Sequence, residues 1–143
     1  MKINSLFLII FILSCSSSPR YHADNVVETT RKDTKDTFYG ISSYYGLNDG
    51  FDGNLTANGE IFDKDGVSGA HKTLPLNSIV KVTNLDNGKS LTLKINDRGP
   101  YIKGRILDCS YGAALKLDFV QQGTTNVKVK VIKWGDNVYK KQN

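Results

Sequence analysis

The sequence predicts a small β-rich domain that closes, or nearly closes, into a barrel. Short runs of alternating apolar and polar residues recur across residues 38–134, Gly is frequent with 13 in 143 residues, and only one short segment has a helical pattern. Many short strands separated by turn signals, with little helix, are typical of small β-barrels. A chain of 143 residues has room for one domain of ordinary size and an appendage.

The strongest single element is a β-hairpin formed by residues 79–85 and 90–96. Both runs are rich in β-branched and aliphatic residues, and Asn87-Gly88 lies in the connection between them. Asn-Gly is the strongest short-range hairpin signal, because both residues tolerate the positive φ angles of the turn. Successive strand side chains point to opposite faces, so the second run has one apolar face. That face is formed by Leu91, Leu93 and Ile95.

Three other runs have strand patterns, and one segment has the pattern of a helix. Residues 38–46, 105–110 and 126–132 are predicted strands. Ser110 is a suitable N-cap for a helix over residues 111–117, because its hydroxyl can accept a hydrogen bond from a backbone N–H of the first turn. The prediction is therefore a mainly β domain with one or two short helices.

The N-terminus has the features of an export signal. Lys2 precedes an apolar run, residues 6–13, which is too short to span a bilayer but suits the hydrophobic region of a signal peptide. Ser14 and Cys15 follow directly, and a small residue before Cys at this boundary resembles the bacterial lipobox, in which the cysteine is acylated. We expect residues 1–14 to be a signal peptide and Cys15 to be a lipid anchor in the bacterial cell envelope. An ordinary cleaved signal that contains a Cys is the alternative.

The segment after the cysteine is expected to be a tether. Residues 15–37 are polar and rich in Ser and Thr, which predicts a flexible linker between the lipid and the folded domain. Ser16, rather than Asp, follows the cysteine, and this favours the periplasmic face of the outer membrane over the inner membrane. The folded domain is expected over residues 38–134, followed by a short tail, residues 135–143.

The charge of the chain is mildly basic. The formal net charge is +5 at pH 7, and removal of a signal peptide takes away one cation, Lys2, and leaves +4. The chain has no basic runs and no nucleic-acid-binding motif, so we expect no nucleic-acid partner. For an exported protein, this charge suits an anionic polymer of the envelope. Solvation alone is the alternative.

The sequence has no pattern for a metal site or a catalytic thiol. His22 and His71 are far apart, and no Cys-x-x-Cys pair accompanies them. Cys109 lies among apolar residues, where we expect a small buried hydrophobe rather than a nucleophile. An acylated Cys15 could not form a disulfide with it. We expect no metal and no cofactor.

Asp97 and Arg98 stand where a predicted strand ends, directly before Gly99-Pro100. Simple alternation points Asp97 to the side of Ile95 and Arg98 to the other side, with Asp97 at the rim of a cleft. Partial desolvation and a second carboxylate nearby both raise a carboxyl pKa, which suits a group that protonates a leaving oxygen. The alternative from this stretch alone is structural: Asp97 caps a turn and Arg98 forms a surface ion pair.

Five short motifs occur in a characteristic order along the predicted domain. They are SSYYG at residues 42–46, TANGE at 56–60, GAH at 69–71, NDRGP at 96–100 and GRILDCS at 104–110. Each motif alone is weak, but the conjunction is specific. Together they resemble the rare lipoprotein A family of bacterial envelope proteins, over nearly all of the predicted domain.

The resemblance implies a six-stranded double-psi β-barrel, related to barwin and the expansins. It also implies an endolytic lytic transglycosylase that cleaves the MurNAc–GlcNAc bonds of peptidoglycan strands lacking stem peptides and leaves 1,6-anhydromuramyl ends. Many family members carry a C-terminal peptidoglycan-binding repeat domain, for which residues 135–143 leave no room. Peptidoglycan is the expected substrate, cell-division proteins are expected partners, and the chain is expected to be a monomer.

Carried over by position, the family's functional residues fall on Glu60, His71 and Asp97. We expect Asp97 to protonate the glycosidic oxygen and then accept the proton of the attacking muramyl C6 hydroxyl, so that no water nucleophile is needed. Glu60 would favour the protonated form of Asp97 or stabilise the oxocarbenium charge, and His71 would orient one of them or the substrate. Structural alternatives are that His71 caps a turn and that Glu60 binds backbone amides. The residues expected to contact the substrate are Arg98, Tyr44, Tyr45, Asn58, Lys72 and Lys103.

Two further points stay open from the sequence. Strand alternation lets only one of the rings of Tyr44 and Tyr45 face a sugar, and the other is expected to pack in the core. The function itself has an alternative of another class: a non-catalytic, glycan-binding envelope lipoprotein, as the relation to expansins permits. An enzyme that acts on proteins or nucleic acids is a third, more distant reading.

Overall fold

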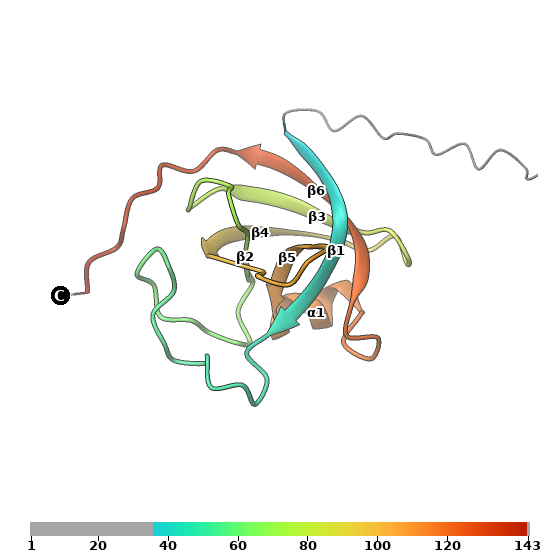
Figure 1. The fold of residues 1–143 in the computed structure, drawn as a ribbon, viewed down its shortest axis with the longest axis horizontal. Coiled ribbons are helices and arrows are strands. Elements are labelled where there is room, and N and C mark those ends of the chain that lie inside the picture. Colours follow the sequence, from blue (N-terminus) through green and yellow to red (C-terminus); the bar gives the residue numbers. More distant parts are fainter. Residues whose placement is uncertain (1–35, 143) are drawn as a thin grey trace, which may run out of the picture. The chain divides into compact units, whose positions relative to one another are not determined.

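The computed structural model of the protein describes residues 36–142, which form a six-stranded barrel with one helix (Figure 1). The predicted signal peptide, Cys15 and nearly all of the predicted linker lie outside the described residues. In chain order, the elements are β1 (Thr37–Tyr45), β2 (Ser68–Ala70), β3 (Ile79–Asn84), β4 (Ser90–Asp97), β5 (Arg105–Ser110), α1 (Tyr111–Leu117) and β6 (Thr125–Lys133).

The strands close into a barrel in the order β1-β5-β2-β4-β3-β6, and β6 pairs again with β1. The pairs β1–β5 and β2–β4 are parallel, whereas the other four pairs are antiparallel. Closure leaves no strand of the ring with an unpaired edge. The predicted mainly β fold with a six-stranded barrel is confirmed.

Five of the six strands and the helix agree with the sequence prediction to within one or two residues. The exception is β2, because its three residues are too few to show an alternation. Space is tight around Gly69 at the middle of β2: a Cβ atom there would lie 3.2–3.3 Å from the carbonyl of Asp108 and from the side chains of Leu93 and Leu107. This short strand therefore fits closely between β4 and β5.

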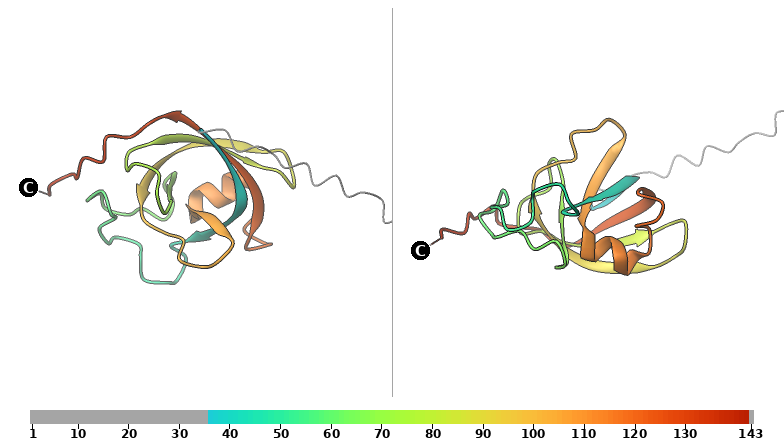
Figure 2. Two further views of the ribbon diagram at one scale, coloured as in Figure 1. Left: turned by 45° about the horizontal axis from the view of Figure 1, so that its top comes forward. Right: turned by 90° about the horizontal axis from the view of Figure 1, so that it is seen from below.

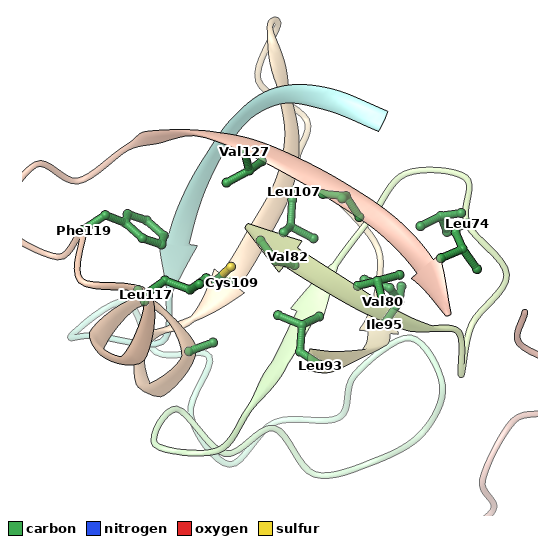
Figure 3. Close-up of a cluster of buried hydrophobic side chains, with 14 residues drawn as sticks. Leu74, Val80, Val82, Leu93, Ile95, Leu107, Cys109, Leu117, Phe119 and Val127 are labelled. Atoms are coloured by element: carbon green, nitrogen blue, oxygen red, sulfur yellow. The ribbon is translucent and has the colours of Figure 1, made fainter. Parts of the chain in front are cut away.

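The barrel interior is filled by inward-pointing apolar side chains from β3, β4, β5 and β6, together with residues of α1 and the segment that follows it (Figure 3). Cys109 belongs to this core: it is fully buried, and burial raises its pKa to about 12. The prediction of a small buried hydrophobe at this position is confirmed. The buried cluster comprises Leu74, Val80, Val82, Leu93, Ile95, Leu107, Cys109, Ala113, Ala114, Leu117, Phe119, Val127, Val129 and Val131.

Helix α1 begins where the sequence predicts. The hydroxyl of Ser110 accepts a hydrogen bond from the N–H of Ala113, and Asp118, in the left-handed region, ends the helix. The helix packs against β1, β4 and β5 and lies within the outline of the ring of strands (Figure 2, left view). Among residues 36–142, no helix combines the length and the apolar character needed to cross a membrane.

Residues 135–142 follow β6 and lie against the domain. The side chain of Asn137 accepts a hydrogen bond from the N–H of Leu76 (2.7 Å), and its own N–H donates to the carbonyl of Leu76 (3.2 Å). The N–H of Lys140 donates to the carbonyl of Asn58 (2.7 Å). The segment predicted as a short tail is therefore tied to the loop that carries the TANGE motif.

Candidate active site

A cleft of about 190 Å³, called the first cleft below, lies where the ends of β1, β2 and β4 meet β5. It brings together residues that are up to 63 positions apart in the chain, from Tyr45 to Asp108. Both a strand-end carboxyl group and a mid-strand carboxyl group line it. The lining residues are Tyr45, Phe51, Ala70, Asp97, Arg98, Gly99, Pro100, Tyr101 and Asp108.

Asp97 reaches the first cleft because β4 contains one extra residue opposite β2. Gly69 pairs with Ile95 but Ala70 pairs with Asp97, so Asn96 is the extra residue. A β-bulge of this kind re-aims the side chain that follows it. The simple alternation that placed Asp97 on the side of Ile95 is therefore wrong. Ile95 is fully buried in the core, whereas Asp97 lines the cleft beside Ala70.

Three donors hold the Asp97 carboxylate in one orientation. Its Oδ1 accepts hydrogen bonds from the backbone N–H groups of Ala57 (3.0 Å) and Arg98 (2.9 Å). Its Oδ2 accepts a hydrogen bond from the hydroxyl of Tyr45 (3.2 Å). Because Ala57 belongs to the TANGE motif, this contact links two of the motifs that lie 40 residues apart in the sequence. The side chain remains partly exposed to the cleft.

Tyr45, rather than Tyr44, is the aromatic ring of this cleft. Its ring stacks on Phe62 with the centroids 4.4 Å apart and an interplanar angle of 16°. Burial, together with the neighbouring charge of Asp97, raises the pKa of Tyr45, so its hydroxyl stays a proton donor. Tyr44 packs edge-on against Phe119 beside the core and does not line the first cleft. The substrate contact predicted for Tyr44 is therefore not at this site.

Asp108 is the second carboxyl group of the first cleft, and it is not among the site residues predicted from the sequence. The last residue of β2 pairs with Asp97 on one side and with Asp108 on the other, which places their Cα atoms about 10 Å apart. Asp108 accepts a hydrogen bond from the hydroxyl of Ser43, which accepts one from Nη1 of Arg105 (3.1 Å). Burial raises the pKa of Asp108 against the opposing effects of these two partners. The sequence signal that could have identified Asp108 is its position between Leu107 and Cys109, two inward-facing apolar residues of β5.

Arg98 ties the end of β4 to the loop after β2. Its Nη1 donates hydrogen bonds to the carbonyl oxygens of His71 (3.1 Å) and Leu74 (2.7 Å). The N–H of His71 donates to the carbonyl of Asp97 (3.2 Å) and adds a second link between the same two segments. The guanidinium thus holds a wall of the first cleft in place through backbone carbonyls, rather than through the surface ion pair of the structural alternative, and its predicted substrate contact stays a prediction.

Glu60 has a different set of partners. Its carboxylate forms an ion pair with Lys94 and accepts a hydrogen bond from Nδ2 of Asn96 (3.2 Å). Burial tends to raise the pKa of Glu60, but the hydrogen bonds from Lys94 and Asn96 outweigh it and leave the pKa below its usual value. Glu60 does not line the first cleft. Asp108, not Glu60, is the carboxyl group that shares a cleft with Asp97.

Asn58 is a structural residue of the TANGE loop. Only 1% of its surface is exposed. Its Oδ1 accepts hydrogen bonds from the hydroxyl of Thr56 (2.6 Å) and the N–H of Glu60 (3.2 Å), and its Nδ2 donates to Oδ1 of Asn77 (2.8 Å). The amide is buried and bonded at both ends, which makes it a support for the loop; its predicted contact with the substrate stays a prediction.

His71 lies in a second cleft, of about 250 Å³. Its Nδ1 accepts hydrogen bonds from the N–H groups of Thr73 (3.2 Å) and Leu74 (3.0 Å), so the ring caps the turn that follows β2. Burial, with the charges of Arg98 and Lys72 adding to it, lowers the pKa of His71 to about 4. The ring is therefore neutral at pH 7, and because Nδ1 is an acceptor its proton is on Nε2.

The remaining predicted contacts divide between the second cleft and open surface. Lys72 is exposed and lines the second cleft. Lys103 is exposed in the loop between β4 and β5 and lines neither cleft. Within residues 36–142, no three His, Cys, Asp or Glu side chains are grouped as metal ligands. The residues that line the second cleft are Phe38, Tyr39, His71, Lys72, Thr73, Arg105 and Ile106.

Comparison with known families decides the relationship of this chain. The family model described as lytic transglycolase matches residues 37–129, which is most of the described domain. The chain belongs to this family. The resemblance to rare lipoprotein A that the motifs indicated is confirmed by curated relatives. The part of the chain that matches the family model, residues 37–129, contains most of the six-stranded barrel.

Two curated relatives illustrate the similarity. The endolytic peptidoglycan transglycosylase RlpA of Vibrio cholerae is 56% identical over 93 residues, which are 65% of this chain and 35% of that protein. The protein of the same name from Campylobacter jejuni is 46% identical over 102 residues, which are 71% of this chain and 36% of that protein. The chain thus matches about a third of the length of these relatives.

Solved structures support the fold. Streptomyces papain inhibitor superposes with a TM-score of 0.56 at 20% identity, over 71% of this chain and all of that one. An expansin of Clavibacter michiganensis superposes with a TM-score of 0.55 at 16% identity, over 68% of this chain and 50% of that one. The lytic transglycolase domain therefore has the double-psi barrel fold that the motifs implied.

Proposed function

We propose that this domain is a peptidoglycan lytic transglycosylase, which cleaves MurNAc–GlcNAc bonds within glycan strands and prefers strands without stem peptides. The family and the names of the relatives support this proposal. The observation that carries it is the first cleft, where the carboxyl groups of Asp97 and Asp108 flank one short strand beside the ring of Tyr45.

The reaction needs one group that gives a proton and later takes one back. Asp97, in its protonated form, donates its proton to the glycosidic oxygen while the bond from that oxygen to the anomeric carbon breaks. The C6 hydroxyl of the same muramyl residue attacks the anomeric carbon, and its proton passes to Asp97. One proton leaves and one returns, no water is consumed, and the product carries a 1,6-anhydro ring. The two-carboxylate water activation of an inverting hydrolase is not required.

Other residues hold this acid and stabilise the charge that develops. The N–H of Ala57 and the hydroxyl of Tyr45 fix the orientation of the carboxyl group. Asp108, held by its hydrogen bond from Ser43, stabilises the positive charge that develops at the anomeric carbon. Glu60 acts through its ion pair, which fixes the loop that supplies the Ala57 N–H, and His71 acts by capping the turn after β2.

The proposal extends to the place where the enzyme works. Residues 1–14 act as a signal peptide, Cys15 carries lipid, and the polar residues up to β1 let the domain reach glycan strands from the periplasmic face of the outer membrane. In this setting the domain works as a monomer and meets proteins of the division apparatus.

A non-catalytic role is the second candidate. A mutant expansin of Clavibacter michiganensis, half of whose chain superposes on this fold, has a solved structure in complex with cellohexaose, a glycan. By analogy, the first cleft would hold a peptidoglycan strand without cutting it. The two carboxyl groups of the cleft also make hydrolysis a chemical alternative, since one could activate water while the other protonates the leaving oxygen.

The mass of the products separates these possibilities. Purified residues 36–143 are incubated with glycan strands stripped of stem peptides, and the released fragments are weighed by mass spectrometry. Fragments with 1,6-anhydromuramyl ends, lighter by one water than hydrolysis products, are the expected result. Fragments with reducing ends would show a hydrolase, and intact strands that co-sediment with the protein would show a binding module.

A further inference from the structure

The second cleft is a site for which the proposed reaction gives no role. It lies beside the first cleft along the same strands: Phe38 and Tyr39 precede Tyr45 on β1, and Arg105 precedes Asp108 on β5. Arg105 and Asp108 are three positions apart on β5, which corresponds to about 10 Å of strand. A glycan strand that occupies the first cleft can therefore continue into the second.

The chemistry of the second cleft suits an anion on an otherwise neutral ligand. Lys72 and Arg105 supply two cations, and the described residues that line the cleft include no Asp or Glu. The ring of His71, held neutral with its proton on Nε2, adds a neutral donor. Cations with a neutral donor at a cleft wall recognise a carboxylate through charge-assisted hydrogen bonds.

The apolar part of the lining of the second cleft suits a sugar ring. The aromatic side chains of Phe38 and Tyr39 and the aliphatic side chain of Ile106 form the apolar part of its lining. Sugar rings place apolar C–H faces against such surfaces and leave their hydroxyl and acid substituents for the polar groups. The second cleft thus offers both features of an acid-bearing sugar: an apolar wall and a cationic edge.

Two consecutive hydrogen bonds connect the second cleft to the first. Arg105 donates a hydrogen bond to the hydroxyl of Ser43, and this hydroxyl donates one to Asp108. Arg105 therefore lines the second cleft while it helps to hold the carboxyl group of the first. A ligand anion at the second cleft would lie next to this link.

We infer that the second cleft is a subsite for a muramyl residue with a free lactyl carboxylate, in register with the bond cleaved in the first cleft. The inference rests on the proposed glycan-cleaving function and gives a physical reason for the substrate preference. In a strand with stem peptides, the lactyl carboxyl is an amide and has no charge, so Lys72 and Arg105 lose their partner. In a strand without stem peptides, the carboxylate is free to bind.

Two forms of one substrate test this subsite. Glycan strands without stem peptides are used directly, or after their lactyl carboxylates have been coupled to methylamine, which gives neutral amides of similar size. For the wild-type domain we expect KM to be about threefold to fivefold lower for the free-carboxylate strand, with similar kcat for both. Added salt should narrow this difference, because the cationic edge is partly exposed.

The variant Lys72→Gln should raise KM for the free-carboxylate strand and leave KM for the amide strand unchanged. Lys72→Arg should keep the preference, since it keeps the charge. Lys81→Gln, at an exposed lysine of β3 that lines neither cleft, is the matched control and should behave as wild type. Equal KM values of the wild type for both strands, or equal losses of Lys72→Gln and Lys81→Gln, would overturn the subsite.

A binding measurement tests the second cleft as a subsite even where the domain does not cleave the strands. If the wild type cleaves neither strand, the proposed reaction fails, and binding of the same two end-labelled strands is measured by fluorescence anisotropy. Tighter binding of the free-carboxylate strand that Lys72→Gln abolishes would still sustain the subsite. Equal binding of the two strands would refute it independently of catalysis.

Discussion

Asp97 and Glu60 are both carboxylates of the sequence motifs, yet their surroundings in the barrel differ. Asp97 lines a cleft, and its three hydrogen-bond donors leave it partly exposed to a ligand. Glu60 forms an ion pair with Lys94, accepts a hydrogen bond from Asn96 and lines neither cleft. A carboxylate at a cleft can exchange a proton with a ligand, whereas one satisfied by a neighbouring cation holds two segments together.

The loop between the two explains the difference. In the loop of residues 56–60, the N–H of Ala57 donates a hydrogen bond to Asp97. The chain then turns at Gly59, whose φ of +82° favours glycine. A Cβ atom at Gly59 would lie 2.3 Å from the carbonyl of Lys140, so the C-terminal segment also fixes this turn. After the turn, Glu60 is carried to β4, and its ion pair holds the loop against Asp97. We therefore propose that Asp97 performs the reaction and that Glu60 positions it.

The largest effect is expected from Asp97→Asn. The amide has the same shape but cannot deliver a proton to the glycosidic oxygen, so release of anhydromuramyl fragments should fall by at least about 100-fold. The rate of fragment release from strands without stem peptides measures this. Circular dichroism should show an intact barrel. A folded variant with wild-type release would exclude Asp97 as the acid.

Asp108→Asn should reduce release by about tenfold to 100-fold. The variant keeps the hydrogen bond from Ser43 but removes the negative charge that opposes the developing positive charge. The loss should appear in kcat rather than in KM, because the charge develops only in the transition state. A loss confined to KM would show that Asp108 binds the substrate and does not act on the reaction.

Glu60→Gln should reduce release by about tenfold or less and lower the free energy of unfolding by about 1 kcal/mol. The reason is the loss of its ion pair with Lys94, which loosens the loop that orients Asp97. A double-mutant cycle with Lys94→Gln measures this coupling. Additive losses in the cycle, with activity as low as in Asp97→Asn, would show that Glu60 acts on the substrate directly.

His71→Asn should have its effect on stability at acidic pH. The pKa of His71 is about 4 in the folded protein and about 6.5 when unfolded, so between these values only the unfolded chain binds the proton. This group therefore lowers the free energy of unfolding as pH falls from 6.5 to 4, by about 3 kcal/mol in total. Asn can place Oδ1 where Nδ1 accepts the two turn N–H groups, without titrating.

Urea denaturation of both proteins at pH 7 and pH 4.5 checks this expectation. The wild type should lose more stability than His71→Asn between the two pH values. The nearby charges of Arg98 and Lys72, which contribute to the lowered pKa of His71, are common to both proteins. Parallel losses in the two proteins would show that His71 is not the buried titrating group.

The secondary structure of this chain was largely predictable because its signals are local. Asn87-Gly88 and the alternation on either side predict the β3–β4 hairpin, and Ser110 predicts the start of α1. β2 was not predictable, because its place between two strands depends on the small size of Gly69 rather than on a pattern. The motifs supplied the closed barrel that the local signals alone left open.

The site was predictable only in part, because its geometry depends on register. Asp97 was identified from its motif, but its direction depends on a one-residue bulge at Asn96 that strand alternation cannot show. Asp108 became a site residue only because β2 pairs with both β4 and β5 and so places Asp108 across one strand from Asp97. Glu60 was assigned by position to the reaction, and its ion pair with Lys94 depends on where a distant loop turns.

The assignment of Asp97 as the acid is tested by a crystal structure of the Asp97→Asn variant with a bound glycan fragment that lacks stem peptides. We expect a glycosidic oxygen within hydrogen-bond distance of residue 97, with the adjoining sugar between Tyr45 and Asp108. A fragment seated instead against Glu60 and Lys94, with the first cleft empty, would contradict it.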